Sequence, residues 1–275
     1  MRPERILLAL PLAACAFAQS AWLPPPRKVV LTPAFVYQGF DRFWMGGNRA
    51  TLSDPVRQRS LTLGVEYGIS RKLAADFTAG YTGTRTTAFG GNGTDTGMTD
   101  TLAGIRYRLV DEAAAGSRWL PTIAARIGVI AGGSYRPNYP FSAGDGASGG
   151  EISLLLGKAF SDAGLGAYGD IGFRKRARRV PDDLFGSAGI YKTVKKVSLS
   201  AGYRQASGLS GMDIGDSGFT FPRLKEIVKS LELGLGFTGK GVYYQLFSAH
   251  ALGGRNTGAK LVVGVSASFS FDAKR

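Results

Sequence analysis

Arginine and carboxylate residues alternate with apolar residues along several stretches of this chain, as Arg106 and Arg108 do on either side of Tyr107. Side chains along a β-strand point alternately to two faces, so these charges would gather on one face of a sheet. Arginine binds carboxylates at two points and stays charged at any working pH, so such a face could bind anionic solutes or form internal ion pairs. The candidates are Arg106, Arg108, Arg126, Arg174, Arg204, Glu66, Asp76, Glu151, Asp170 and Glu232.

Ser248 and His250 are a second candidate for chemistry, because His250 is the only histidine and Ser248 would share its face of a strand. A serine nucleophile with a histidine base could hydrolyse lipid esters. No third group that would orient the histidine can be identified, and Ser-x-His occurs readily by chance. The sequence contains no recognisable metal cluster, phosphate-binding loop or nucleophile elbow, and it predicts no cofactor.

The elements that would position these residues are β-strands. From Leu61 to Ile69 and from Leu73 to Thr82, apolar residues alternate with small or polar ones, and the short connection predicts a tight hairpin. The stretch from Leu261 to Phe271 alternates in the same way. The other strands are expected at about 29–40, 103–109, 121–132, 150–160, 164–174, 184–192, 196–205, 226–238 and 241–250.

The expected connections alternate in length. Short ones lie near 70–72, 161–163, 193–195 and 239–240, and long ones at 46–58, 84–97, 133–149, 175–183 and 206–224. Transmembrane β-barrels have short periplasmic turns and longer outer loops. The sequence therefore predicts an all-β fold, a single antiparallel transmembrane β-barrel of about twelve strands over residues 29–271.

Aromatic residues support this prediction, because transmembrane barrels carry an aromatic girdle at each membrane interface. The expected outward aromatics are Tyr67, Tyr107, Phe160, Phe237, Phe269 and Phe271 near periplasmic ends, and Tyr81, Phe173 and Tyr203 near outer ends. Two strands are ambiguous. In Leu184–Lys192 either phase is defensible, and in Val242–His250 both faces carry aromatics, with Val242, Tyr244 and Leu246 taken as outward.

Residues 1–18 resemble a secretory signal, with a charged start, an apolar core and the small-x-small pattern Ala16-Phe17-Ala18. Cleavage there would leave a periplasmic lead over 19–28. The alternative is that Leu12–Cys15 is a lipobox and Cys15 carries a lipid. If the signal is removed, the mature chain has no cysteine, which excludes disulfides and thiol chemistry.

No stretch approaches the roughly 20 apolar residues of a membrane-spanning helix, so a membrane location requires strands. The formal net charge of +14 is compatible with nucleic acid, but export argues against that partner. Lipopolysaccharide phosphates, anionic outer-membrane lipids or an acidic solute are the expected partners. The run from Arg174 to Arg179 is expected in an outer loop, solvated or in contact with lipopolysaccharide.

If apolar residues face lipid, the ten charged candidates face the lumen. They would then either form the eyelet of a passive channel for small polar or anionic solutes, or pair into a plug that keeps the barrel round. Oppositely charged positions recur on neighbouring strands, and Arg126 with Glu151 is one such expected pair. The alternatives are a hydrophobic-compound transporter with a lateral opening near Leu184–Lys192, a lipid hydrolase using Ser248 and His250, and a structural or adhesive surface barrel.

With a signal, alternating strands and a final strand ending in Phe271, the chain resembles Gram-negative outer-membrane β-barrel proteins over its mature length. The resemblance implies an outer-membrane location and recognition of the last strand by the barrel-assembly machinery, although the tail 272–275 departs from that signal. Leu63–Ile69 and the Gly-x-Arg-Tyr-like strands are similar to the transporter-like family called MetA pathway of phenol degradation. That similarity implies uptake of small molecules, and no functional residue is carried over from it.

Overall fold

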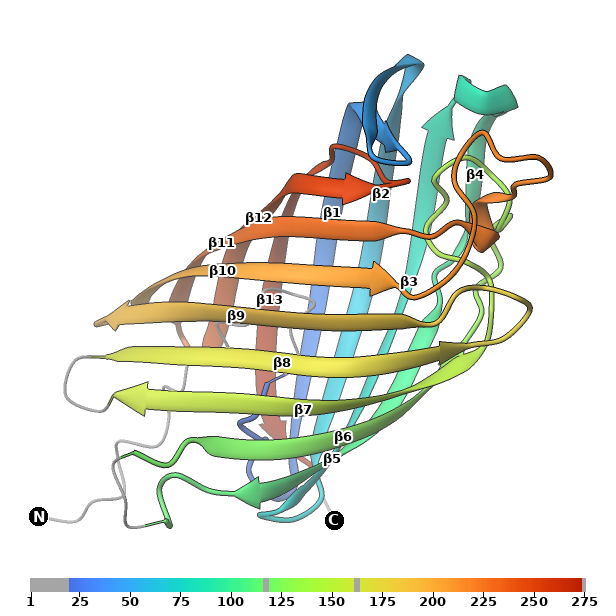
Figure 1. Ribbon diagram of the computed structural model, residues 1–275. Helices are drawn as coiled ribbons and strands as arrows, with labels where there is room; N and C mark the ends of the chain where they lie inside the picture. Colours follow the sequence, from blue (N-terminus) through green and yellow to red (C-terminus); the bar gives the residue numbers. More distant parts are fainter. Residues whose placement is uncertain (1–19, 116–118, 161–163, 274–275) are drawn as a thin grey trace, which may run out of the picture.

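The computed structural model describes residues 20–115, 119–160 and 164–273, which form a β-barrel (Figure 1). The predicted signal segment, with Cys15, lies outside these residues. The first strands are β1 (Lys28–Met45), β2 (Asn48–Gly68), β3 (Leu73–Thr86), β4 (Gly93–Met98), β5 (Thr101–Val110), β6 (Thr122–Ala131) and β7 (Gly149–Phe160). The others are β8 (Leu165–Arg176), β9 (Asp183–Val194), β10 (Val197–Gly208), β11 (Ile227–Gly239), β12 (Val242–Arg255) and β13 (Leu261–Asp272).

The sheet closes on itself, as predicted. Every named pairing is antiparallel, and β1 pairs with both β2 and β13, so that the last strand joins the first. β4 and β5 share one position in the wall, because both pair with β3 along different parts of its length. The barrel is therefore twelve-stranded. Each described strand except the short β4 pairs with a neighbour on both sides. Such closure is the condition for spanning a bilayer with strands.

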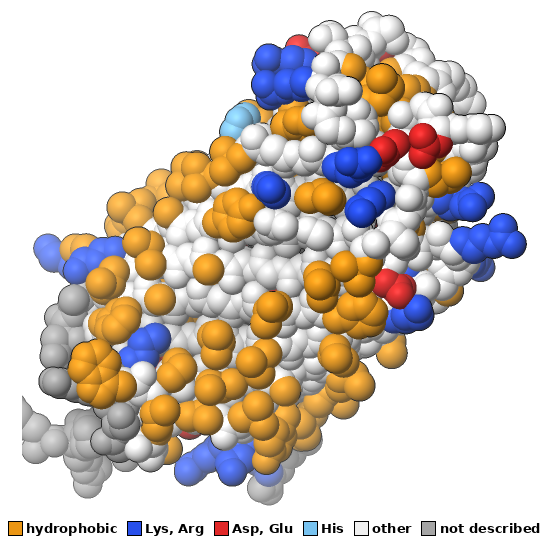
Figure 2. Space-filling view, in the orientation of Figure 1, with side chains coloured by type: hydrophobic (Ala, Val, Ile, Leu, Met, Phe, Trp, Pro, Cys, Tyr) orange, Lys and Arg blue, Asp and Glu red, His pale blue; other side chains and the backbone are white. Residues whose placement is uncertain are grey.

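The alternating pattern divides the wall into two faces. Large apolar side chains point outward and are exposed, for example Ile127 at 64% and Ile171 at 63%. Figure 2 shows such side chains spread over the wall, with lysine and arginine collected toward its ends. A contiguous apolar surface of this extent is rare on soluble monomers and is typical of a lipid-facing wall. Of the predicted girdle aromatics, all except Tyr67 and Phe173 are more than one third exposed, and those two are partly exposed.

The two ambiguous strands have defined phases. In β9, Tyr191 and Ser187 are buried in the interior while Ile190 is 59% exposed. In β12, Gln245 and Phe247 are buried and Tyr244 and Leu246 are exposed, as expected. In the part of the chain that the structure describes, no helix is long and apolar enough to cross a bilayer.

The barrel has two unlike ends. We call the end with the connections 69–72, 111–121, 161–164, 195–196 and 240–241 the turn end. The opposite end carries 87–92, 132–148, 177–182, 209–226 and 256–260 and is called the loop end. It lies at the upper right of Figure 1.

Two loop predictions were wrong. Residues 46–58 do not form a loop, because β1 and β2 continue as a hairpin that turns at 46–47, with a register shift between Phe40 and Arg42. That irregularity accommodates Pro55, which cannot donate to a regular ladder. Within 84–97, β3 continues to Thr86 and β4 begins at Gly93. The extra strand residues lie beyond the apolar band, where alternation no longer marks a strand.

The run from Arg174 to Arg179 was also assigned incorrectly. Its first three residues are the last three of β8, and only Ala177, Arg178 and Arg179 belong to a loop. The Arg176 side chain is 5% exposed and lies 2.7 Å from the Asp100 carboxylate. Because acidic partners neutralise Arg174 and Arg176, these basic residues can lie inside the wall rather than in solvent.

Candidate functional site

A chain of ion pairs crosses the inner wall from β2 to β8. Arg106 on β5 lies 2.5 Å from Glu66 on β2 and 3.3 Å from Asp76 on β3. Arg126 on β6 bridges Asp76, at 2.7 Å, and Glu151 on β7. The chain continues because Arg174 on β8 lies 2.9 Å from Glu151. Six of the ten predicted lumen residues thus form one network, and the expected pair of Arg126 with Glu151 is part of it.

Small residues make room for the centre of this network. A Cβ atom at Gly104 would lie 2.6 Å from the Arg126 guanidinium carbon, and one at Gly128 would lie 2.6 Å from its Nη1. The guanidinium therefore lies over two glycines and reaches carboxylates on both sides. Arg126 and Glu151 have side chains only 1% exposed. Charges so deeply buried are tolerated because each has charged hydrogen-bonding partners.

The remaining predicted residues lie apart from that chain. Arg204 on β10 is 2.8 Å from Glu232 on β11, and the Ser187 hydroxyl donates to Asp170 on β8. Arg108 pairs with Asp111 in the connection that follows β5. All ten candidates are on the inward phase, but they form several groups rather than one ring.

Residues just before β1 enter the turn end of the lumen. The carbonyl oxygen of Ser20 accepts a hydrogen bond of 3.0 Å from Arg106 Nη1, and Ala21 packs against Ala124 and Leu155. The Trp22 indole Nε1–H donates to Glu112 at 3.1 Å. The indole also lies over Gly157, where a Cβ would come within 2.7 Å of the ring. The segment 20–22 therefore covers part of the network from the turn end.

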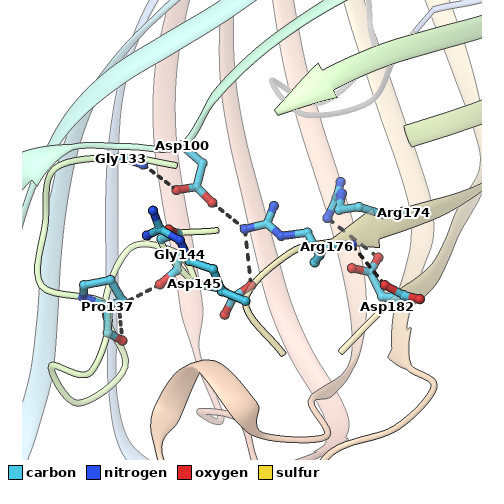
Figure 3. Close-up of polar contacts among 12 residues, drawn as sticks. Asp100, Gly133, Pro137, Gly144, Asp145, Arg174, Arg176 and Asp182 are labelled. Carbon is cyan, nitrogen blue, oxygen red and sulfur yellow. Dashed lines mark hydrogen bonds and ion pairs between the residues drawn. The ribbon is translucent and has the colours of Figure 1, made fainter. Parts of the chain in front are cut away.

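Asp100, in the break between β4 and β5, fixes the long connection 132–148 (Figure 3). Its Oδ1 accepts hydrogen bonds from the Gly133 backbone N–H at 2.9 Å and from the Tyr135 hydroxyl at 2.5 Å. Its Oδ2 pairs with Arg176. Tyr135 in turn accepts from the Gly146 N–H at 2.7 Å. One partly buried carboxylate, acting directly and through Tyr135, thus ties both ends of the loop to the strand β8.

Aromatic side chains form a cluster at the loop end. Phe141, from the anchored loop, packs edge-to-face on Phe40 at 5.1 Å and on Phe221, in the loop 209–226, at 5.2 Å between ring centres. Buried Phe43, Leu52 and other apolar residues complete the core of this cluster. Edge-to-face rings add to the stability from buried apolar area, so two loops and the β1–β2 hairpin are held together there.

A cavity of about 290 Å³ lies among these loops and strands. Phe40, Phe141 and Phe221 give part of its lining an apolar character. The charged residues that line it are Asp145, Asp183, Glu226, Arg174 and Lys260. Arg174 belongs both to this cavity and to the ion-pair network, so the cavity and the network adjoin.

The Asp145 carboxylate in the anchored loop has an unusual acidity. Burial, followed by the negative charge of Glu226, raises its pKa from 3.8 to about 6, and Arg176 at 3.6 Å opposes the shift. Asp100 and Asp183 add to the negative charge around it. Although 45% of the side chain is exposed, it lines the cavity rather than a flat outer surface. Asp145 therefore becomes protonated at a pH at which most surface carboxylates are still ionised.

Ser248 and His250 lie on the outward phase of β12. The strand neighbours of His250 are Leu231 and Leu261, and those of Ser248 are Leu233 and Val263. Among the hydrogen bonds of the described residues, none joins the two side chains to each other or to a carboxylate. The geometry thus provides no activated nucleophile for the hydrolase alternative.

Asp100, Asp145 and the segment 20–22 are parts of this site that were not predicted from the sequence. The apolar alternation is interrupted at Thr99 and Asp100, and this break could have indicated that Asp100 lies between two strands. No local pattern marks Asp145, because its environment is assembled from four separate segments.

No family model matches the chain, and no curated protein matches it in sequence. The similarity to the MetA-pathway family therefore stays a prediction. Among solved structures, the COG4313 outer membrane channel from Pseudomonas putida F1 superposes with a TM-score of 0.75 at 10% identity, over 91% of this chain and 98% of that one. The translocator domain of autotransporter NalP from Neisseria meningitidis gives 0.51 at 17% identity, over 90% of both chains.

LpxR from Salmonella typhimurium also gives a TM-score of 0.51, at 10% identity, over 86% of this chain and 99% of that one. At these identities the similarity concerns the fold alone. The chain has the fold of outer-membrane β-barrels, a closed antiparallel sheet of twelve strands.

Proposed function

We propose that this protein is an outer-membrane channel that passes small molecules by passive diffusion through a charge-lined lumen. The observation that carries the proposal is a closed barrel whose interior holds an ion-pair network beside a cavity of about 290 Å³. A purely structural barrel has no need of a cavity lined by unlike charges. The similarity in fold to an outer membrane channel over nearly its whole length supports the same conclusion.

The location belongs to the same proposal. A lipid-facing apolar wall and twelve closed strands suit the outer membrane of Gram-negative bacteria. Export by a signal over residues 1–18 and insertion by the barrel-assembly machinery are part of this proposal. The lead over 19–28 would enter from the periplasmic side, with residues 20–22 within the turn end of the lumen. In this orientation the loop end faces the cell exterior and the turn end faces the periplasm.

Selection of solutes would depend on the ion-pair network. Arg126 is shared between Asp76 and Glu151, so its removal leaves two carboxylates without their common cation. The ten lumen residues are five arginines and five carboxylates, so their formal charges balance, and the loss of one positive charge favours cations.

The test is conductance of the purified protein in planar lipid bilayers. We expect Arg126→Gln to shift the reversal potential in a salt gradient toward cation selectivity. Arg179→Gln is the matched control, because it removes the same charge from an exposed loop residue outside the network. Selectivity that does not change in Arg126→Gln would count against the eyelet. Absence of any conductance in the unmodified protein would count against the channel itself.

A further inference from the structure

Three arginines stand together on the outward face of the wall near the loop end. Arg57 and Arg85 are direct register partners on β2 and β3, and Arg59 lies two residues from Arg57 on the same face. All three side chains are exposed. Like charges directly opposite each other on a sheet are destabilising, so this arrangement costs stability unless an anion lies between them.

The protein supplies no such anion. Among the ion pairs and hydrogen bonds of residues 20–115, 119–160 and 164–273, none involves the side chains of Arg57, Arg59 or Arg85. Their register partners on β1 and β4 are neutral. Arg57 is opposite Gly39 and Arg59 is opposite Tyr37 on β1, while Arg85 is opposite Thr94 on β4. Thr94 and Thr96 are exposed, so their hydroxyl groups are free to donate to the same anion.

An apolar groove of about 850 Å³ lies on the outer wall next to the three arginines, on the side away from the loop end. Leu61 and Tyr81, a register pair on β2 and β3, line it, and Arg59 is the next outward residue along β2. The groove extends across β13 and β1. Small outward residues create the hollow where other strands carry leucine or isoleucine, and these are Pro33, Ala79 and Ala267.

The ladder between β1 and β13 is also interrupted beside the groove, although its register is the same on both sides of the gap. Partners pass from Leu31 with Phe269 directly to Ala34 with Ser266, because Pro33 has no N–H to donate. The ladder gap and the small side chains together leave an open apolar depression on the outer wall. Extended acyl chains have the width and the polarity to occupy such a groove in a bilayer.

We propose that this arginine cluster and groove form a binding site for one lipopolysaccharide molecule. The phosphates would lie on Arg57, Arg59 and Arg85, and the acyl chains would lie in the groove below them. Arginine suits this role because its planar fork binds phosphate through two parallel hydrogen bonds. The cluster lies at the loop end, which the proposed location assigns to the outer leaflet, where the lipid is a phosphorylated glycolipid. The site lies on the outer wall and is independent of solute passage.

The test is native mass spectrometry of the full chain in detergent, titrated with purified lipid A that carries its phosphates. We expect the triple variant Arg57→Gln, Arg59→Gln, Arg85→Gln to bind about tenfold more weakly, since charge-assisted hydrogen bonds to phosphate are lost. The matched control is Lys195→Gln, Lys196→Gln, Lys240→Gln, which removes three exposed cations at the turn end. The control should bind as the unmodified protein does.

A second variant tests the groove without changing charge. Ala79→Phe with Ala267→Phe fills the hollow, and we expect weaker binding of lipid A with the arginines intact. Heat-modifiable migration in gel electrophoresis verifies that each variant is folded. Conductance in planar bilayers should be unchanged in the arginine variant, which separates this site from the proposed channel.

Three outcomes would overturn the proposal. Equal binding of dephosphorylated lipid A would show that the arginines do not hold phosphate. Equal weakening in the lysine control would show that only net charge matters. Tighter binding of phosphatidylglycerol than of lipid A would assign the site to a phospholipid instead.

Discussion

The centre of the interior network is a single arginine over two glycines. Arg126 is held by the contacts it makes with Asp76 and Glu151 and by the space that Gly104 and Gly128 leave for it. The pair with Glu151 could be predicted from sequence, because two inward positions on consecutive strands carry opposite charges. The role of the glycines could not, since a glycine on an inward phase is common in any barrel.

A side chain at Gly104 should disrupt this arrangement. We expect Gly104→Val to lower the free energy of unfolding by about 1–3 kcal/mol, because its branched side chain overpacks the Arg126 guanidinium. The measurement is urea unfolding in lipid vesicles followed by tryptophan fluorescence. Gly253→Val is the matched control, because a Cβ at Gly253 would meet nothing within 4 Å. Equal stability of the two variants would contradict close contact of Arg126 with Gly104.

The raised pKa of Asp145 makes the attachment of the loop 132–148 to the barrel depend on pH. The pKa of this acid rises from 3.8 to about 6 on folding, so its ionised form destabilises the folded state. This loss of stability is absent below about pH 4, increases as the pH rises and is complete above about pH 6. We therefore expect the loop 132–148 to be cleaved more slowly by proteases at pH 5 than at pH 7. Asp145→Asn should remove this difference.

The control for that experiment is Asp41→Asn, an exposed carboxylate on β1 outside the cavity. It should leave the pH dependence of cleavage as it is in the unmodified protein. Cleavage rates of Asp145→Asn that still change between pH 5 and pH 7 would assign the dependence to another group near the loop.

At the scale of elements, alternation predicted the strands within the apolar band and failed at their ends. All of the predicted strand Leu61–Ile69 except its last residue lies within β2, but β2 begins at Asn48, where lipid no longer imposes an apolar phase. The same reason explains why β4 and the end of β8 were assigned to loops. Contacts between residues far apart in the sequence could not be predicted either, because Asp100 binds Gly133, Tyr135 and Arg176 only after the barrel forms.

The segment 20–22 is an element whose position implies a restriction of the lumen. Trp22 packs on Gly157 and lies 6.0 Å from the Tyr191 ring, so its removal should release the segment from the turn end. We expect Trp22→Ala to raise single-channel conductance in planar bilayers.

Trp119→Ala is the control for that change, because Trp119 lies in a connection at the same end and is 78% exposed. It should leave the conductance unaltered. A Trp22→Ala channel with unaltered conductance would mean that the segment does not restrict the path.

At the scale of the whole molecule, one physical condition explains why the fold could be predicted from the sequence and the arrangement of the interior could not. A barrel in lipid must close its ladder and present apolar side chains outward, so each strand carries the same binary signal. That signal predicted the antiparallel barrel and its strand number. The interior does not face one uniform environment. The ion pairs, the segment 20–22 and the loop 132–148 each depend on contacts with particular residues far away in the sequence, which no local pattern predicts.

Depth in the bilayer should therefore govern the cost of a charge on the outer wall. Leu233 lies midway along β11 and is 48% exposed, whereas Leu261 begins β13 at the loop end and is 49% exposed. We expect Leu233→Arg to destabilise the barrel by about 2–4 kcal/mol and Leu261→Arg by about 0–1 kcal/mol. The comparison matches residue type and exposure, so only depth differs. Guanidinium unfolding in phospholipid vesicles measures both values, and equal costs at the two positions would contradict a wall that spans the hydrocarbon core.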